Sequence, residues 1–479
     1  MHTLLRQYIP ALLLSSALLA SRQGYTQIPT SNSYAAHFAR LAPASFPDNS
    51  ALNPAGPPPA VTSVPSAVAN PCKRPHVDIE ELNLLGADSR FPTFADSVTG
   101  AGNPVRRAML CHDFTYRFYN TEGLTANTLN DPVSASQQAY IGERPTWTVG
   151  VYLFITGDLQ IIHLPGYQLT IEGAYSRSNW NAGSPRTLKM SQIVLYKHFF
   201  DRRLEIKAGI QNNDTDFVGM KVGGNQAAGS QGVYTILPAE SGLAYMPLSA
   251  PTFIIRAQPK GFFYGKLGLQ RATSAKGTVA DLHRDSGGLR FAPAGDGLVS
   301  IFEGGYNRDS SATAPEFWVR GGYLNNTTNT YSNMKTGTVT GGNHCTFLLA
   351  DRQLWRSNPD HPTHGIYIGA SFMDVPPELD SYARYYEARI YKKAPLNSRP
   401  MDTVSLVSTY TDFSRYKTSQ AFAAGKSAAT HSATISASYS AHVAPGRYLT
   451  FLTTYNSRPA ITPRLSGALT VMIQANMFF

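Results

Sequence analysis

The amino-acid sequence predicts an all-β protein: a transmembrane antiparallel β-barrel of about 16 strands, preceded by a short N-terminal helical or periplasmic element. Three observations predict this fold. Apolar and polar residues alternate along most of the chain after residue 105, as in strands whose two faces meet different surroundings. No segment beyond the first 21 residues approaches the ~20 consecutive apolar residues that a membrane-spanning helix needs. The chain also ends in a two-faced strand that finishes on an aromatic residue.

The C-terminal strand shows the alternation most clearly. One of its faces is apolar and carries Leu469, Val471, Ile473, Ala475, Met477 and Phe479. The other face is mixed and partly polar, with Thr470, Met472, Gln474, Asn476 and Phe478. An apolar face toward lipid and a wetter face toward a lumen are typical of a membrane barrel, although a soluble β-sandwich also contains two-faced strands.

The first 104 residues are expected to form three segments before the barrel. Residues 1–21 contain a cation at Arg6, an apolar run and small residues at the end, and are predicted to be a secretory signal peptide that is removed on export. Residues 22–75 are rich in Pro, Ala and Ser without a sustained period, which predicts a disordered leader. Residues 76–104 are expected to form a periplasmic or plug element, with a helix over 77–85 that ends at Gly86.

Residues 105–479 are predicted to form the barrel, with the strand pattern beginning near Arg106. Strand-like segments are separated by Gly, Asn, Asp, Ser and Pro clusters of unequal length, as expected for tight periplasmic turns that alternate with longer outer loops. At about 23 residues for a strand and its connection, this part of the chain accommodates around sixteen strands, an even number suited to an antiparallel barrel. Tyr and Phe residues near the strand ends suit an aromatic girdle at the membrane surfaces.

The charge and the cysteine content narrow the expected partners. Without the predicted signal peptide the chain has 40 Lys and Arg against 31 Asp and Glu, a net charge of +9. The basic residues are scattered rather than clustered, so nucleic acid is not an expected partner. The odd number of cysteines in an exported chain argues against a disulfide scaffold. One bridge between Cys72 and Cys111 is possible, and three unpaired structural cysteines are equally possible.

No motif supports an enzyme, a metal site or a bound cofactor. Residues 284–288 (RDSGG) resemble a serine-protease motif, but no general base is placed beside Ser286, so a turn is expected there. His361 and His364 lie in a Pro-containing loop without a nearby carboxylate pair, so solvated side chains are expected rather than metal ligands. The Gly-Lys-Ser triplet at 425–427 lacks the first Gly of a phosphate-binding loop.

Charged and aromatic residues on the expected wet faces of the strands are the candidates for a solute path. A sugar presents many hydroxyl groups and an apolar C–H face, so a path that admits it needs charged hydrogen-bonding groups beside aromatic surfaces. Each of these charges could instead only solvate the lumen or close a cross-strand ion pair. Arg389 is the favoured residue of a constriction, because an acid and two tyrosines share its face. The candidates are Arg117, Glu172, Arg203, Glu205, Lys207, Lys266, Glu303, Arg320, Tyr385, Glu387, Arg389 and Tyr391.

Five short segments are spread over the chain in a characteristic order. They are residues 82–86 (LNLLG), 185–188 (PRTL), 209–217 (GIQNNDTDF), 347–356 (FLLADRQLWR) and 392–402 (KKAPLNSRPMD). In sequence and in order they resemble motifs of the carbohydrate-selective porins of the OprB type. The resemblance implies a sixteen-stranded sugar channel of a Gram-negative outer membrane.

The sequence and this resemblance together lead us to expect an outer-membrane porin that passes mono- or oligosaccharides by diffusion, with no turnover, no cofactor and no metal. The expected partners are the permeating sugars, outer-membrane lipid and lipopolysaccharide, and the chain is expected to be a monomer or a homotrimer. The alternative function is a non-conducting barrel that serves as an envelope scaffold or export accessory. Single-channel conductance would separate the two functions.

Overall fold

The computed structural model describes residues 79–83, 92–180, 187–219, 236–246, 248–285 and 287–479. The chain divides into two compact units, residues 1–32 and 33–479, and only the second contains described residues. The predicted signal peptide (1–21) and leader (22–75) lie outside the described residues, and so does Cys72. Cys345 is buried and carries a free thiol.

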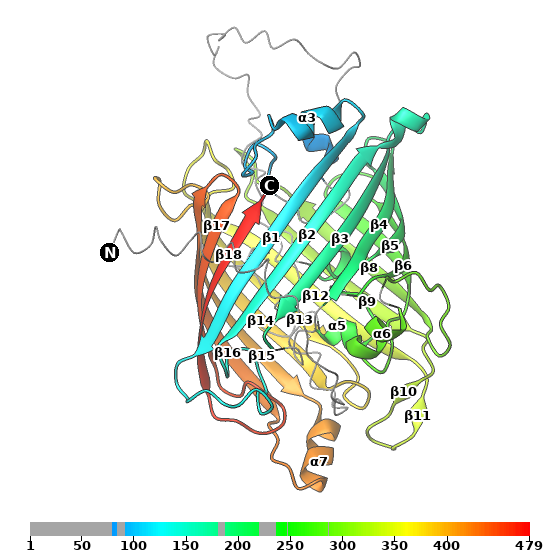
Figure 1. Ribbon diagram of the computed structural model, residues 1–479, viewed down its shortest axis with the longest axis vertical. Helices are drawn as coiled ribbons and strands as arrows, with labels where there is room; N and C mark the ends of the chain where they lie inside the picture. The colour runs from blue at the N-terminus through cyan, green and yellow to red at the C-terminus, as the bar shows by residue number, and fades with distance from the viewer. Residues whose placement is uncertain (1–78, 84–91, 181–186, 220–235, 247, 286) are drawn as a thin grey trace, which may run out of the picture. The chain divides into compact units, whose positions relative to one another are not determined.

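Residues of the second unit form a closed antiparallel barrel of sixteen strands, as predicted (Figure 1). The strands follow one another around the barrel in chain order, and β1 pairs with β18 to close it. Two short strands, β10 (Tyr331–Ser332) and β11 (Val339–Thr340), form a separate two-stranded sheet. The barrel strands are β1 (Phe114–Asn127), β2 (Thr146–Asp158), β3 (Tyr167–Ser178), β4 (Thr187–Phe199), β5 (Leu204–Gln211), β6 (Ala250–Ala257), β7 (Phe263–Arg271), β8 (Leu298–Arg308), β9 (Phe317–Asn326), β12 (Asn343–Arg356), β13 (Gly365–Asp374), β14 (Tyr382–Lys393), β15 (Thr403–Phe413), β16 (His431–Ala444), β17 (Arg447–Asn456) and β18 (Ala468–Phe478).

The connections differ in length at the two ends of the barrel. Long connections such as 128–145, 212–249 and 272–297 leave from one end, whereas short ones such as 200–203 and 445–446 join strands at the other. The C-terminus lies at the end with short connections (Figure 1). In membrane barrels the short turns are periplasmic and the long loops extracellular, and we name the two ends accordingly.

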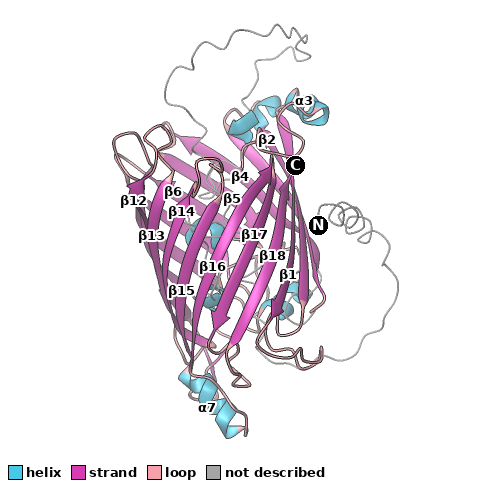
Figure 2. Cartoon of the chain, turned by 90° about the vertical axis from the view of Figure 1, so that its left-hand side faces the viewer, coloured by secondary structure: helices cyan, strands magenta, loops and turns pink. Residues whose placement is uncertain are grey.

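Helices lie mainly in the connections, and Figure 2 shows α3 and α7 beyond the strands at opposite ends. In the described part of the chain, no helix is both long and apolar enough to cross a membrane. The α-helices are α3 (Pro104–Leu110), α4 (Asp214–Phe217), α5 (Ile236–Glu240), α6 (Thr278–Arg284) and α7 (Arg415–Ala423), and the 3₁₀ helices are η4 (Ile79–Leu82) and η5 (Leu159–Ile162).

The start of the barrel differs from the prediction. The strand pattern expected from Arg106 is interrupted by α3, and β1 begins only at Phe114. Asn103 caps this helix by accepting hydrogen bonds from two backbone N–H groups of its first turn, and Pro104 occupies its first position, where the missing N–H has no cost. Of the helix predicted over 77–85, residues 79–82 form the 3₁₀ turn η4, and residues 77–78 and 84–85 lie outside the described residues.

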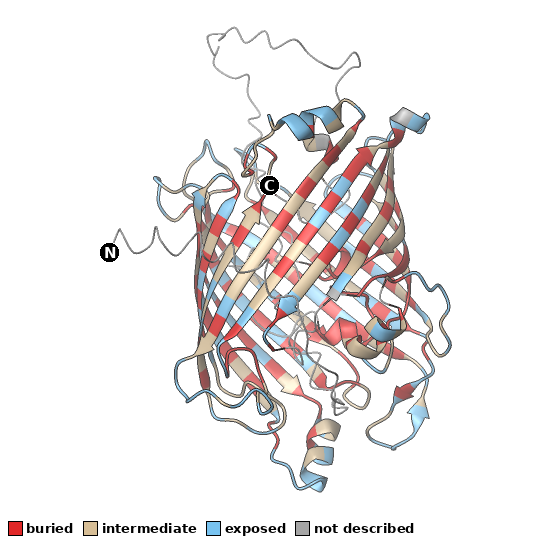
Figure 3. Cartoon of the chain, viewed as in Figure 1, coloured by how far each residue is buried: buried red, intermediate tan, exposed pale blue. Residues whose placement is uncertain are grey.

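The predicted alternation of faces is present in the strands, and Figure 3 shows it as alternating burial. In β18, Val471 and Ile473 face outward and are 38% and 46% exposed. Thr470 and Asn476 face inward and are 7% and 5% exposed. The outward surface is therefore apolar and the inward surface mainly polar, as a barrel in a bilayer requires.

A segment before α3 packs against the periplasmic end of the last strands. Asp96 Oδ1 lies 2.8 Å from His442 Nε2, and Tyr448 donates a hydrogen bond to the same carboxylate. The Val98 N–H donates to the Phe478 carbonyl of β18 (2.7 Å). Burial alone would raise the pKa of Asp96, but these hydrogen bonds outweigh it and the pKa is lowered. The N-terminal segment is therefore tied to the barrel through an ionised carboxylate.

Candidate functional site

The described parts of the connection between β5 and β6, residues 212–219, 236–246 and 248–249, fold into the barrel, and we call them the inner segment. Asp216 in α4 accepts a hydrogen bond from Lys207 of β5 (Nζ–Oδ1 2.7 Å), and its backbone carbonyl accepts one from Arg320 of β9 (3.0 Å). Farther along, Glu240 in α5 accepts a hydrogen bond from the backbone N–H of Ser381, next to β14 (2.9 Å). The inner segment thus reaches from β5 to the edge of β14 across the interior.

Apolar contacts hold the inner segment against the wall. Phe217 and Leu237 belong to one buried cluster with Ile301 of β8 and Leu349 of β12, and each of these side chains is 0% exposed. These inward positions of the wall are apolar because the inner segment covers them. Burial of such side chains stabilises the arrangement by roughly 1.5–3 kcal/mol each.

One ion pair joins the inner segment to the wall and two more join the neighbouring strands, and we call this group the Asp216 cluster. Besides the Lys207–Asp216 pair, Lys266 of β7 lies 3.5 Å from Glu303 of β8, its partner in register. Arg320 lies 3.6 Å from the other oxygen of Glu303, and both of these side chains are fully buried. The cluster contains three cations and two carboxylates, so it presents a net positive charge to the interior.

A second group lies on the inner faces of β12 and β14, and we call it the Arg389 network. Arg389 donates to both oxygens of Asp351 (Nε–Oδ1 3.0 Å, Nη2–Oδ2 2.9 Å) and to Glu387 (2.5 Å). Tyr391 donates to Asp351 (3.0 Å) and Tyr385 to Glu387 (2.5 Å). All three charged side chains are 0% exposed. The charges are satisfied within the network, which holds the two tyrosine rings in place.

Gly369 of β13 makes room for this pairing. A Cβ atom at this position would lie 2.2 Å from Asp351 Oδ1 and 2.4 Å from Arg389 Nε. Next to the pair, the rings of Tyr367 and Tyr391 stack with centroids 5.0 Å apart. Aromatic rings and buried charge therefore lie side by side on this wall.

Arg117 and Glu172 belong to neither group. Arg117 faces inward on β1, but it donates to the Pro92 carbonyl (2.8 Å) and to Asn83 (2.9 Å), and its guanidinium lies 4.3 Å from the centre of the Phe94 ring. The side chain of Arg117 is therefore bound by the N-terminal segment. Glu172 faces inward on β3 and is 3% exposed. Among the described residues, no ion pair joins its carboxylate to the Asp216 cluster or the Arg389 network.

Arg203 is not on the strand where the sequence pattern places it. Residues 200–202 have φ values of 54°, 53° and 65°, so they form a left-handed turn, and β5 begins only after Arg203, which is exposed. Glu205 does face inward, as expected. It accepts hydrogen bonds from Tyr196 (2.9 Å) and Arg256 (3.3 Å) rather than from the Asp216 cluster.

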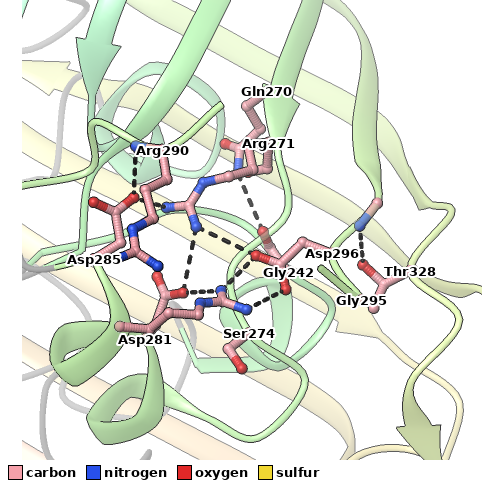
Figure 4. Close-up of polar contacts among 12 residues, drawn as sticks. Gly242, Gln270, Arg271, Ser274, Asp281, Asp285, Arg290, Gly295, Asp296 and Thr328 are labelled. Atoms are coloured by element: carbon pink, nitrogen blue, oxygen red, sulfur yellow. Dashed lines mark hydrogen bonds and ion pairs between the residues drawn. The ribbon is translucent and has the colours of Figure 1, made fainter. Parts of the chain in front are cut away.

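A third charged group fixes the connection between β7 and β8 (Figure 4). Arg271, at the extracellular end of β7, lies within 3.3–3.4 Å of Asp281, Asp285 and Asp296. Arg284 of α6 donates to Asp296 (2.8 Å) and pairs with Asp281. Burial raises the pKa of Asp281, and the two arginines oppose that rise. This group ties α6 to the barrel wall.

Two carboxyl groups lie where α5 meets the extracellular ends of β12 and β14. Glu240 accepts from the Ser381 N–H, and Asp380 accepts from Asn343 (2.9 Å). Burial raises the pKa of Glu240 to about 7 and the pKa of Asp380 well above its usual value. Burial lowers the pKa of Lys417 in α7, and the negative charge of Glu240 opposes that shift. Burial therefore favours the neutral form of both carboxyl groups at this junction.

Sequence reasoning missed Asp216, Asp351 and Gly369. Asp216 and Asp351 lie in two of the five quoted motifs, so the motifs contained the signal, but the pattern did not assign these residues a role. Among the described residues, no group of three or more His, Cys, Asp or Glu side chains is arranged to hold a metal ion. His361 and His364 stack on each other with ring centres 4.7 Å apart, and Ser286 lies outside the described residues.

The closed sixteen-stranded barrel, its apolar outer face and its inner segment define an outer-membrane porin. A family model described as carbohydrate-selective porin, OprB family, matches residues 171–479, more than half of the chain. The chain therefore belongs to the OprB family of carbohydrate-selective porins, and the resemblance seen in the sequence is confirmed. The first motif, at 82–86, lies outside the matched range.

Solved structures of Pseudomonas putida OprB have the same fold. The high-pH structure gives a TM-score of 0.67 at 13% identity and covers 81% of this chain and 99% of that chain. The low-pH structure gives a TM-score of 0.52 at 14% identity and covers 81% of this chain and 100% of that chain. At these identities the likeness shows the fold alone. A comparison with curated protein sequences returns no match.

Proposed function

We propose that this chain lets mono- or oligosaccharides diffuse across the outer membrane through the barrel interior, and that the inner segment narrows their path. The observation that carries the proposal is the inner segment itself. It is tied to one side of the wall by an ion pair and a hydrogen bond, and to the other side by a hydrogen bond. Family membership supports sugars as the solutes. Tyr385 and Tyr391, held by the Arg389 network, are 0% and 2% exposed, so they support the wall beside that path rather than offer aromatic surface to the solute.

Single-channel recording of the purified chain in a planar bilayer tests this function. We expect steady conductance that falls as a sugar is titrated in. Asp216→Ala removes the carboxylate that holds Lys207, so the inner segment should loosen and the conductance rise. Asp374→Ala is a matched control, because Asp374 is an exposed carboxylate paired with Arg384 on the outside of the barrel. Conductance that no sugar reduces would contradict the proposal.

The non-conducting barrel stays the second candidate because the inner segment is packed like a core. Ile236, Leu237 and Leu243 are each 0% exposed. If a folded, membrane-inserted chain conducts no ions, the scaffold or accessory function is favoured instead. Export by a cleaved signal peptide belongs to our proposal as well, and N-terminal sequencing of the mature protein tests it.

A further inference from the structure

Four small side chains form a groove on the outer face of β12–β15. Ala350, Ala370, Ala388 and Ser408 are neighbours in register on successive strands. The groove has a volume of about 430 Å³. This is within the range of ~300–1,000 Å³ that is typical of small-molecule sites.

Large side chains border the groove on both sides. Toward the extracellular end the border is Leu348, Phe372, Tyr386 and Tyr410. Toward the periplasmic end the next row in register is Arg352, Ile368, Ile390 and Leu406, and its three apolar members are 41–47% exposed. A row of small residues between two rows of large ones makes an apolar channel across four strands, wide enough for a hydrocarbon chain.

Arg352 is the charged member of that border. It faces outward on β12 and is exposed, two residues beyond Ala350. Among the described residues, no hydrogen bond or ion pair involves its guanidinium. A lipid-facing arginine without a partner is costly inside the apolar band of a barrel. An anion that approaches from the periplasmic side would remove this cost.

Lys392 of β14 adds a second outward cation at the same end. Its ammonium lies 5.6 Å from the centre of the Trp355 ring, and Trp355 is 52% exposed. By strand spacing and rise, Arg352 and Lys392 are roughly 12 Å apart along the wall, so their long side chains can reach one phosphate between them. An exposed tryptophan beside a lysine is typical of the level of the lipid headgroups.

We propose that this face binds a phospholipid of the periplasmic leaflet, with its phosphate between Arg352 and Lys392 and one acyl chain in the groove lined by Ala350, Ala370 and Ala388. The cations lie on the periplasmic side of the groove, and the groove itself runs across the four strands between its two bordering rows. A second copy of the chain would have to supply an anion at the depth of Arg352. A phospholipid brings that anion with it.

Native mass spectrometry of the full chain in detergent, titrated with phosphatidylglycerol, tests the site. Arg352→Leu should weaken binding at least about five-fold, because each basic residue near a membrane surface contributes about that factor. Ala388→Leu fills the groove and should weaken binding as well. The matched control is Arg447→Leu, which removes an exposed outward cation at the same end, on β17, and should leave binding unchanged. Arg352→Leu places an apolar side chain against lipid, so the barrel should still fold, and heat-modifiable gel migration checks this.

Three results would overturn the proposal. The first is equal affinity of the parent, Arg352→Leu and Ala388→Leu for phosphatidylglycerol. The second is an equal loss in Arg447→Leu, which would show that any exposed cation suffices. The third is a parent that is an oligomer and becomes a monomer in Ala388→Leu, because the groove would then be a contact between copies of the chain.

Discussion

Replacing Arg389 with Ala should destabilise the folded barrel by about 3–5 kcal/mol, the range found when one partner of a buried ion pair is removed. Arg389 gives three hydrogen bonds to Asp351 and Glu387, and all three side chains are fully buried. Without the guanidinium, two carboxylates are left without their cation. The local net charge changes from −1 to −2, so the variant should also shift the reversal potential of the channel toward cations at low salt.

Urea unfolding in detergent micelles measures the loss of stability. Arg384→Ala is the matched control, because Arg384 makes a 2.9 Å ion pair with Asp374 on the outer surface, where the two side chains are 56% and 39% exposed. An exposed pair contributes about 0–1 kcal/mol, so this variant should unfold close to the parent. If Arg389→Ala lowers the free energy of unfolding no more than Arg384→Ala does, the Arg389 network does not stabilise the wall and our reasoning fails.

The remaining predictions concern the packing at Gly369 in the barrel wall, the contacts of the N-terminal segment and the pH dependence of stability. Gly369→Ala places a methyl group inside the bidentate pair of the Arg389 network and should lower the urea midpoint, whereas Gly173→Ala, where a Cβ meets nothing within 4 Å, should not. Asp96→Asn should lower the free energy of unfolding by about 1.5–3 kcal/mol at neutral pH, because hydrogen bonds to a charged carboxylate are lost. Since the pKa of Asp96 is lowered, this cost should disappear in urea titrations as the pH falls below about 4. The pH dependence that Glu240 contributes to stability is opposite to that of Asp96. Burial raises the pKa of Glu240 from 4.5 to about 7. Docking of the inner segment is therefore favoured at low pH and weakens as the pH rises from about 4.5 to about 7. Urea midpoints between pH 5 and 8 should therefore fall in the parent and change less in Glu240→Gln, and equal slopes would contradict this.

The strands that the sequence predicted best are those whose inner face meets polar groups. In β14 the charged and tyrosine residues alternate with outward apolar ones, so the shared face of Tyr385, Glu387, Arg389 and Tyr391 follows from the period of a strand alone. In β6 the pattern fails. Ile254 faces inward and is 3% exposed because it packs in the cluster of the inner segment, so apolar residues occupy both faces.

The partners of the candidate residues could not be predicted, because they depend on register between strands distant in sequence. Asp351 lies 38 residues before Arg389, and only the pairing of β12 and β14 with β13 brings the two together. Similarly, the alternation of β5 continues back to Arg203, and it does not reveal that residues 200–202 turn with positive φ. The sequence of the inner segment shows no regular alternation of apolar and polar residues. Its place inside the barrel is therefore set by packing and could not be predicted from the pattern.

β1 and β18 are the one pair of neighbouring barrel strands that do not follow each other in the chain. Every other neighbouring pair of barrel strands is consecutive in chain order, but Tyr119 and Asn476, hydrogen-bonded across this junction, are 357 residues apart. Joining such distant segments has an entropic cost of about 5 kcal/mol for a flexible chain. Until that happens the growing sheet has two unpaired edges, each able to pair with strands of other molecules. The last strand to be synthesised removes both edges at once, so a chain that lacks it is expected to aggregate as well as to be inactive.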